Sequence, residues 1–586
     1  MRIVRLFPFA CAAFMMSACA SENDDKGGDT NAEGKAQYMA VNIVSVGTNG
    51  SRAAGDKYEN GLPKESHIKD VRFYFYNQDG SPYILDWNKT NWIEPYDKIS
   101  DGQQNTTGGN ITQETNSVLV FKPATGNSAP YSVIAVVNAE SLGNTLTNSL
   151  GKGTQELNSL LKTIEDKQFY KVNITAGTTT PTTNYDKAAS AENFVMTSSV
   201  YLKDGEPQCQ TFVSGHVYNN ADEAKNKPID IYVERVVAKV TADVDETNWS
   251  LGNGTNWANT KYGKVVGKTT NGTDVYAVIE GWNVADENAT AMLEKQIDKT
   301  WTTEGLGFAN DNPWNTNDYH RCFWEKSTEA GATGNDLINY SYKTIAGNTL
   351  KNVVYTLPNT LQTAPTEKYN NKLTKFIVAA TLRYQNPTTK KWDNVEICRY
   401  KGIEYIGQNA VLDVIGSESG IYVKKAGSTT YTSLGHDQLK FTKDKTSGAE
   451  DYKAIAVVDG AKVNVSELYT KDVTTGIYTN VASLDNVNQA IQKENADVRA
   501  SGKAYYYIPI RHLGTAEKKP AYYGVVRNHV YQITISDMQG FGTPVVKEDE
   551  TIIPTKPEYD ETYLAAKIKV LSWRIVKQNA DLDYSK

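Results

Sequence analysis

Cysteine is scarce in this sequence, and its scarcity excludes a fold held together by a disulfide framework. Only five cysteines occur in 586 residues. Cys11 and Cys19 fall near the N-terminus, which leaves Cys209, Cys322 and Cys398 far apart along the chain. Three cysteines leave room for one bridge at most, and buried free thiols are the simpler expectation. Ordinary burial of apolar side chains must therefore stabilise the domains.

Residue patterns for catalysis, cofactors and metals are also lacking. The six histidines are scattered without an HExxH pair, and there is no GxSxG, GxGxxG or phosphate-binding loop. The acidic run Glu548–Glu550 lacks the ligand spacing of a calcium loop. We therefore expect no catalytic residue, no enzyme activity, no cofactor and no bound metal.

A concentration of positive charge is missing as well. The formal net charge is −7, and no block of lysine and arginine stands out, which argues against a nucleic-acid partner. Tyrosine outnumbers phenylalanine 36 to 14, glycine is frequent and long helical patterns are few. This composition predicts an all-β protein with a few short helices, in a chain long enough for two to four domains.

The N-terminus has the features of a secretory signal. Arg2 and Arg5 precede a short apolar run that ends in Met16-Ser17-Ala18-Cys19. Small residues before a cysteine resemble a bacterial lipobox, so residues 1–19 are interpreted as a lipoprotein signal peptide with lipid attached at Cys19. The acidic residues that follow resemble a surface-export signal, or serve only as part of a flexible tether over residues 20–36.

The first clear strand covers residues 37–46, where Met39, Val41 and Ile43 share one face. A loop of small residues follows and contains Arg52. Loops of this kind are preferred sites of proteolysis. Arg52 is either an ordinary loop residue or the site of a cut between Arg52 and Ala53. Such a cut would free the strand and open an apolar groove flanked by two unpaired strand edges.

Two bodies are predicted between this strand and the C-terminal tether. The first covers residues 37–225, and the second covers residues 226–545 and opens with one long alternating strand over residues 229–244. Short helices are expected near residues 288–299 and 484–499.

The last part of the chain reads as a tether followed by a strand. Residues 546–562 combine prolines with a cluster of acids, which is typical of an extended linker. Within residues 563–586 the apolar side chains alternate and then change phase after Val570, which indicates a bulge or a change of partner. These apolar residues are Leu564, Ala566, Ile568, Val570, Leu571, Trp573, Ile575 and Val576. Such a strand must be covered, either by its own body or by another molecule.

Three segments together resemble the fimbrillin family of Bacteroidales. Residues 231–240 are similar to its VERxVAK strand, residues 525–531 to its VRNxxY strand, and residues 569–576 to its VLxW ending. The resemblance keeps the motif order and spans most of the chain, although residues 245–272 and 417–474 match no family motif. It implies two tandem transthyretin-like β-sandwich domains plus a C-terminal donor strand.

The resemblance also implies a function. It identifies the chain as a shaft subunit, similar to minor fimbrillins, of a type V pilus, exported as an outer-membrane lipoprotein precursor and cut by an arginine-specific protease at Arg52. The C-terminal strand of one subunit would then fill the groove vacated in the next. The implied partners are identical subunits in a head-to-tail polymer and accessory tip and anchor subunits. Two alternatives stay open: a tip or accessory subunit, and a surface glycan-binding lipoprotein that uses Trp314, Tyr319 and Trp324.

Overall fold

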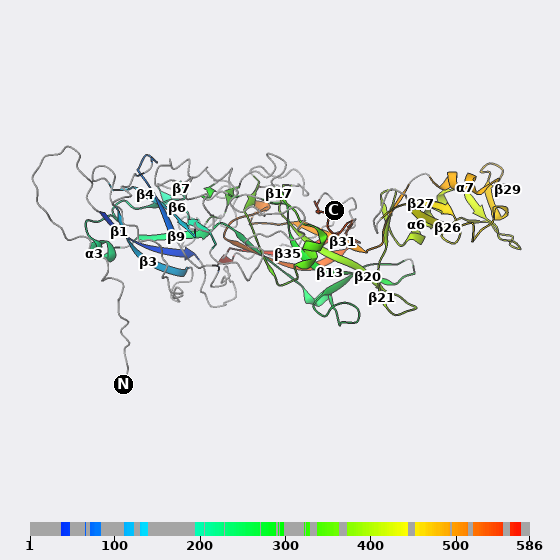
Figure 1. Ribbon diagram of the computed structural model, residues 1–586, viewed down its shortest axis with the longest axis horizontal. Coiled ribbons are helices and arrows are strands. Elements are labelled where there is room, and N and C mark those ends of the chain that lie inside the picture. Colours follow the sequence, from blue (N-terminus) through cyan, green and yellow to red (C-terminus); the bar gives the residue numbers. More distant parts are fainter. Residues whose placement is uncertain are drawn as a thin grey trace, which may run out of the picture.

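A computed structural model shows a chain built mainly from strands, with four short helices among its described residues (Figure 1). The helices are α3 (Ala221–Asn226), α5 (Tyr342–Gly347), α6 (Gln408–Glu418) and α7 (Leu484–Ile491). No helix in the described part of the chain has the length and apolar character needed to cross a membrane. The all-β prediction is confirmed. The structure describes residues 37–46, 65, 71–81, 83, 111–121, 129–138, 194–203, 206–227, 229–269, 271–288, 291, 294–297, 322, 324–327, 337–361, 372–443, 452–492, 495–513, 520–545, 547–554, 563–572 and 574–575.

The N-terminal part of the chain forms one described sheet with the strand order β2-β4-β5-β9-β1-β3 and β8 paired with β4. Its core contains Met39, Phe73, Val133 and Ile231, all of which are buried. The strands are β1 (Gln37–Val46), β2 (Val71–Tyr76), β3 (Ile111–Phe121), β4 (Ser132–Val137), β5 (Met196–Ser198), β8 (Thr211–Phe212) and β9 (Ile229–Arg235).

Two further sheets, called here the first and the second large sheet, enclose the main core of the protein. The first has the order β18-β10-β33-β35-β36, with β10 (Ala238–Val244), β18 (Val353–Thr356), β33 (His529–Gln539), β35 (Tyr563–Ser572) and β36 (Arg574–Ile575). The second has the order β11-β12-β13-β20-β31-β34, with β21 paired to β20. Its strands are β11 (Ser250–Leu251), β12 (Tyr262–Lys268), β13 (Asp274–Ala285), β20 (Lys375–Gln385), β21 (Trp392–Asn394), β31 (Lys503–Pro509) and β34 (Thr543–Pro544). Val240 and Ile533 of the first sheet share one hydrophobic cluster with Ala277, Val378 and Tyr506 of the second.

Residues 397–499 form an inserted body with a hydrophobic core of its own, which includes Leu412, Val423, Leu468 and Val498. It leaves the second large sheet after β21 and returns to it at β31. One of its sheets has β22 (Ile397–Tyr400), β23 (Ile403–Ile406), β26 (Leu439–Lys443), β27 (Tyr452–Val458) and β30 (Ala496–Arg499). The other has β24 (Ile421–Val423), β25 (Thr432–Ser433), β28 (Leu468–Lys471) and β29 (Tyr478–Asn480). In Figure 1 this body lies at one end of the molecule and the β1 sheet at the other.

Four two-stranded ladders complete the described pairing. They join β6 (Tyr201–Lys203) to β7 (Glu206–Gln208), β14 (Glu287–Asn288) to β17 (Leu337–Ile338), β15 (Gln296–Ile297) to β16 (Glu325–Lys326), and β19 (Asn359–Thr360) to β32 (Gly524–Val525).

Three sequence-based expectations differ from the structure. The long strand predicted over residues 229–244 is two strands, because β9 joins the N-terminal sheet whereas β10 joins the first large sheet. The helix predicted near residues 288–299 is contradicted by β14 and β15, which begin and end that stretch with strand pairing. The helix predicted over residues 484–499 begins correctly at Leu484 but ends at Ile491. The remainder contains β30, which pairs with β22 and β27 and buries Ala496 and Val498 on one face.

The described residues of the two stretches without a matching family motif contribute strands to the fold. Residues 245–272 contribute β11 and β12 to the second large sheet. Residues 417–474 supply a large share of the inserted body, including β24, β26 and β28. Both segments therefore build sheets.

Candidate strand-exchange site and interdomain junction

Strand β1 lies inside its sheet, between β9 and β3. It pairs in parallel with β9 from Val41↔Ile229 to Ser45↔Val233. It pairs antiparallel with β3 along its full length, from Gln37↔Phe121 to Val46↔Ile111. Loss of β1 would therefore leave one unpaired edge on β9 and one on β3. We call the space between these two strands the β1 slot.

The three residues predicted to fill the groove occupy alternate positions of β1. Met39 is fully buried in the core of the sheet. Val41 is paired with Ser117 and Ile229, and Ile43 with Thr115 and Ile231. The strand begins and ends at the predicted residues, Gln37 and Val46.

The C-terminal strand β35 lies along β33 of its own chain. The predicted donor residues have β33 partners from Leu564↔Met538 through Ala566↔Ile535, Ile568↔Ile533 and Val570↔Tyr531 to Leu571↔Val530. Ile575 lies on β36, opposite Leu571. Trp573 and Val576 are outside the described residues.

The phase change predicted after Val570 is not a bulge in β35. The register runs without interruption from Val570 to Ser572, and the irregularity lies on the partner strand between Ile535 and Asp537. Beyond Ser572 the chain folds back, so that Arg574 pairs with Ser572 in β36. Leu571 stays in β35, on the face opposite that of Val570, and the reversal beyond Ser572 places Ile575 opposite Leu571.

Strand β35 is nearly an edge strand in this arrangement. One side carries the ten-residue ladder with β33, whereas the other, as far as the described residues show, carries only the two pairs with β36. A strand of this kind has backbone N–H and C=O groups free for a further partner.

The proposed lipidation and cleavage positions, Cys19, Arg52 and Ala53, lie outside the described residues. The first described residue after them is Glu65, whose side chain is fully buried. Its carboxylate lies 3.2 Å from Lys239 Nζ and accepts a hydrogen bond from the Tyr355 hydroxyl. Its backbone oxygen accepts from Arg235 Nε at 2.7 Å. The chain after the predicted cut is thus anchored where β9 ends and β10 begins.

The same place brings together residues of the two motifs that resemble the fimbrillin strands. Arg235 at the end of β9 donates from Nη1 to Asn528 Oδ1 at 3.2 Å. Asn528 adopts a positive φ of 55° and donates its backbone N–H to Val237 O at 2.8 Å. Asparagine tolerates this left-handed conformation better than most residues. The VERxVAK and VRNxxY segments therefore meet at a junction between the N-terminal sheet and the first large sheet.

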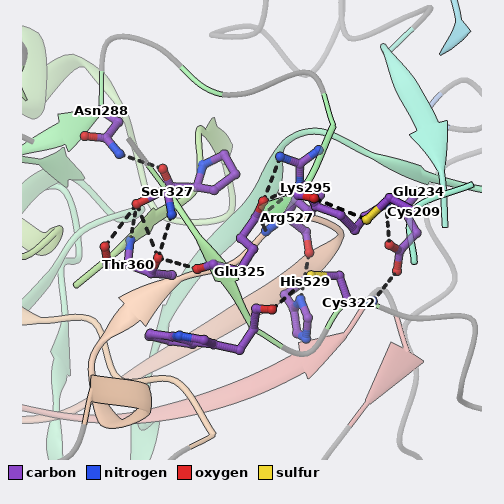
Figure 2. A network of polar contacts seen from close by, with 12 residues as sticks. Cys209, Glu234, Asn288, Lys295, Cys322, Glu325, Ser327, Thr360, Arg527 and His529 are labelled. Carbon is purple, nitrogen blue, oxygen red and sulfur yellow. Dashed lines mark hydrogen bonds and ion pairs between the residues drawn. The ribbon is translucent and has the colours of Figure 1, made fainter. Parts of the chain in front are cut away.

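Glu234, the neighbour of Arg235, binds a second set of partners at this junction (Figure 2). Its Oε1 accepts from the backbone N–H of Cys322 at 2.9 Å, and its Oε2 lies 3.1 Å from Lys295 Nζ. The thiol of Cys209 donates to Lys295 O at 3.2 Å. Burial acts to lower the pKa of Lys295, but Glu234 and Glu294 outweigh it and the net shift is upward, so the ammonium stays charged.

Arg527 and Glu325 form a buried ion pair with three close nitrogen–oxygen contacts. Arg527 Nε lies 2.9 and 2.8 Å from the two carboxylate oxygens, and Nη2 lies 2.7 Å from Oε2. Both side chains are 1% exposed. Arg527 belongs to the VRNxxY segment and Glu325 to β16, so the pair connects segments separated by 202 residues.

Removal of one member of this pair is expected to destabilise the protein strongly. Glu325→Ala leaves the guanidinium buried without its carboxylate, which costs about 3–5 kcal/mol. Denaturant unfolding monitored by fluorescence measures this loss. Glu418→Gln is the control, because its carboxylate pairs with Lys401 Nζ at 2.7 Å where the two side chains are 44% and 41% exposed, and exposed pairs contribute about 1 kcal/mol or less. Equal effects of the two substitutions would contradict the structural role of the buried pair.

Glu294 is a buried carboxyl of the junction that has no hydrogen-bond partner within the described residues. Burial is the main reason that its pKa is raised to about 8, while Lys295 and Arg527 act to lower it. The group is therefore mostly protonated at neutral pH in the folded chain.

This shift predicts a pH dependence of stability. Between the usual value of 4.5 and about 8, the folded chain keeps a proton that the unfolded chain has released, so the free energy of unfolding falls as the pH rises. Glu294→Gln should remove this contribution, which amounts to at most about 1.4 kcal/mol per pH unit. Urea unfolding at pH 5 and pH 8 measures the difference. Glu418→Gln, which alters an exposed pair with Lys401, is the control and should leave the change of unfolding free energy with pH as in the unmodified protein. The same change with pH in Glu294→Gln as in the unmodified protein would contradict the prediction.

The junction residues Glu65, Glu294, Lys295 and Glu325 were not identified as site residues from the sequence. A signal was present in their partners, because Glu234, Arg235, Lys239 and Arg527 lie in segments predicted as buried strands, and buried charges require partners. The partners themselves lie 61 to 202 residues away, with no local pattern.

The described residues offer little for chemistry at this junction. Cys209, Cys322 and Cys398 are free thiols, all buried, and burial raises the pKa of each. A raised pKa keeps a thiol protonated and unreactive. No group of three or more histidine, cysteine or acidic residues in the described part of the chain is placed to hold a metal ion.

Comparisons with known proteins agree on the C-terminal part of the chain. The family model described as "Major fimbrial subunit protein type IV, Fimbrillin, C-terminal" matches residues 500–579, which include β31, β33 and β35. No curated protein matches the chain.

Several solved structures cover most of the chain at low similarity. A protein described as a cell adhesion protein from Bacteroides eggerthii is 10% identical, with a TM-score of 0.32 over 93% of this chain and 98% of that one. A fimbrial assembly protein from Parabacteroides distasonis is 13% identical, with a TM-score of 0.26 over 73% and 97%. A C-terminally truncated form of the tip fimbrial protein Mfa3 from Porphyromonas gingivalis is 10% identical, with a TM-score of 0.27 over 92% and 100%. With identities and TM-scores this low, these likenesses carry no argument, and the family match covers residues 500–579 alone.

Proposed function

We propose that this chain is a structural shaft subunit of a fimbria that polymerises by donor-strand exchange, a proposal supported by the match of residues 500–579 to the C-terminal fimbrillin model. Lipid at Cys19 would hold the precursor at the outer membrane. A cut between Arg52 and Ala53 by an arginine-specific protease would release β1, and β35 of a neighbouring subunit would fill the β1 slot. The two sandwich domains would then repeat along a surface fimbria.

The position of β1 between two strands is the observation that carries this proposal. In its own chain β35 has one long ladder, with β33. In the β1 slot of a neighbour it would have two, one with β9 and one with β3, which are the ladders that β1 has now. Exchange therefore breaks one ladder and makes two, and it covers the apolar residues that β1 leaves exposed.

The separation of the two strands explains why the product would be a filament. β1 lies in the N-terminal sheet and β35 in the first large sheet, in different parts of the molecule (Figure 1). Each subunit would thus accept at one place and donate at another. Head-to-tail contacts give a closed ring if the rotation between neighbouring subunits closes, and an open filament if it does not. The remaining partners of the polymer would be accessory tip and anchor subunits.

The presence of a donor strand favours the shaft over the tip. A tip subunit has no further subunit to which it must donate a strand. This chain has a C-terminal strand that, among the described residues, has one nearly free edge. The glycan-binding alternative loses part of its support, because Trp324 is 1% exposed inside the main core. Trp314 and Tyr319 lie outside the described residues.

Disulfide trapping tests the exchange directly. Ser117→Cys on β3 and Ile568→Cys on β35 lie in different sheets of one chain, so we expect no bond within the precursor. After treatment with an arginine-specific protease, the pair should yield covalent ladders on a non-reducing gel. A control chain with Lys268→Cys on β12 in place of Ser117→Cys should give none. The cysteine on β3 is also moved to other positions of the strand, so that several registers are tested. Polymers that form without a cross-link at any of these positions would contradict insertion of β35 in the β1 slot.

A further inference from the structure

The inserted body, residues 397–499, takes no part in the proposed exchange. None of β1, β3, β9 and β35 belongs to it, and it has its own core and sheets. The protein therefore displays a separate folded unit at the end of the molecule opposite the β1 sheet (Figure 1). Polymerisation alone does not require such a unit.

One sheet of this body, β25-β24-β28-β29, has an aromatic outer face. Its inner face buries Ile421, Val423 and Leu468. The register places Tyr422 opposite Tyr469, and Lys471 opposite Tyr478, on the other face. With Tyr431, which precedes β25, these residues form what we call the tyrosine face: Tyr422, Lys424, Tyr431, Tyr469, Lys471 and Tyr478.

The four rings of the tyrosine face contact one another while remaining partly exposed. Tyr431 and Tyr478 are stacked, with centroids 3.8 Å apart and planes 6° apart. Tyr469 meets Tyr431 edge to face at 5.1 Å, and Tyr422 meets Tyr478 in the same way at 5.2 Å. These contacts fix the rings in place, so a ligand that binds them loses little side-chain entropy from the protein.

Two lysines of the face lack carboxylate partners. Lys424 Nζ lies 5.0 Å from the Tyr431 ring centroid, and Lys471 Nζ lies 5.4 Å from that of Tyr478. Neither makes a salt bridge with a described residue, whereas Lys401 and Lys440 of the same body pair with Glu418 and Asp459 at 2.7 and 3.0 Å. Glu467, whose backbone oxygen accepts from Lys424 N–H, uses its carboxylate to accept from the Asn464 backbone N–H at 2.9 Å, and Asp472 Oδ1 accepts from the backbone N–H groups of Thr474 and Thr475. Positive charge is thus left unpaired beside an aromatic platform.

We propose that the tyrosine face binds an acidic carbohydrate. The apolar C–H groups of a pyranose ring pack against the exposed parts of the tyrosine rings, and a sulfate or carboxylate on the sugar pairs with the ammonium groups of Lys424 and Lys471. The phenol hydroxyls at the rim supply hydrogen bonds to sugar hydroxyls. A neutral sugar would leave the two lysines without a counter-charge, which is why the charge on the face selects an acidic ligand. This binding is independent of strand exchange.

Calorimetric titration of the full-length chain tests the proposal. The probes are a chondroitin sulfate hexasaccharide, neutral maltohexaose and the oligonucleotide dT6. We expect the sulfated hexasaccharide to bind with a Kd of roughly 0.1–1 mM, weakening as salt is added, and maltohexaose to bind at least about tenfold more weakly. Binding of dT6 as tight as that of the hexasaccharide would overturn the carbohydrate assignment, because bases also stack on aromatic rings.

Matched variants separate the face from the rest of the surface. Tyr431→Ala should weaken binding about tenfold, whereas Tyr431→Phe should retain it. The double variant Lys424→Gln with Lys471→Gln should weaken binding about fivefold and remove most of its salt dependence. Two controls should bind as the unmodified chain does. Trp392→Ala alters a second partly exposed aromatic cluster, with Trp257 and Tyr276, and Lys440→Gln removes a paired lysine of the same body. Absence of binding, or binding that survives loss of Tyr431 and both lysines, would overturn the proposal.

Discussion

A precursor carrying Arg52→Ala is expected to remain monomeric when treated with the processing protease, whereas the unmodified chain forms polymer. The reason is the placement of β1. It holds ten residues between β9 and β3 and buries Met39 completely, so no incoming strand can enter while it stays. About six to eight apolar donor side chains, each contributing about 1.5–3 kcal/mol on burial, would otherwise favour insertion. In this proposal β1 prevents polymerisation by occupying the slot that the incoming strand would enter. Cleavage of a single peptide bond would remove this obstacle.

Size-exclusion chromatography and gel electrophoresis without heating measure the result. The expected change is loss of essentially all polymer, with the precursor kept at full length. Arg52→Lys tests the residue preference, since it keeps the charge but should resist an arginine-specific protease. Lys57→Ala alters a nearby basic residue and should polymerise normally. Polymer of normal length from Arg52→Ala would show that β1 leaves its slot without this cut.

The junction limits what the cut can release. Glu65 is fully buried and binds Lys239, Tyr355 and Arg235. The chain that follows the proposed cut is thereby held to the body at Glu65. The segment that the cut would release therefore does not include Glu65. The end of β9, which forms one wall of the β1 slot, is held by the same contacts, since Arg235 binds Glu65 and Asn528. The wall of the β1 slot is thus fixed, through Asn528, to the sheet that contains β35, the proposed donor strand.

The parts of the fold that follow from local patterns were predictable. β1 and β35 alternate apolar and polar residues, and both begin at the expected residue, Gln37 and Tyr563. The division of residues 229–244 was not predictable, because β9 and β10 alternate in the same way whichever sheet each one joins. What separates them is a distant contact, in which Asn528 binds the backbone of Val237.

The polar junction and the inserted body were missed for a related reason. Glu65 lies 170 residues before Arg235 and 290 before Tyr355, and no spacing rule connects such positions. The sheets of the inserted body consist of strands of two to seven residues, which are too short for a clear period. Its tyrosines are unremarkable in a chain with 36 of them, and only the pairing of β24, β28 and β29 gathers four on one face.

Removal of residues 563–586 is expected to give a subunit that is cut normally at Arg52 but cannot donate a strand. Its β1 slot stays intact, so it should still accept β35 from an unmodified neighbour. One truncated subunit therefore ends a filament at the donor side and leaves the acceptor side working. Mixed with unmodified subunits before protease treatment, it should shorten the polymers in proportion to its share, and electron microscopy of filament length measures this. Deletion of residues 577–586 alone keeps β35 and β36 and should leave the length unchanged. If the truncated subunit polymerised on its own, β35 would not be the donor. If it failed to shorten mixed filaments, β1 would not occupy the acceptor slot.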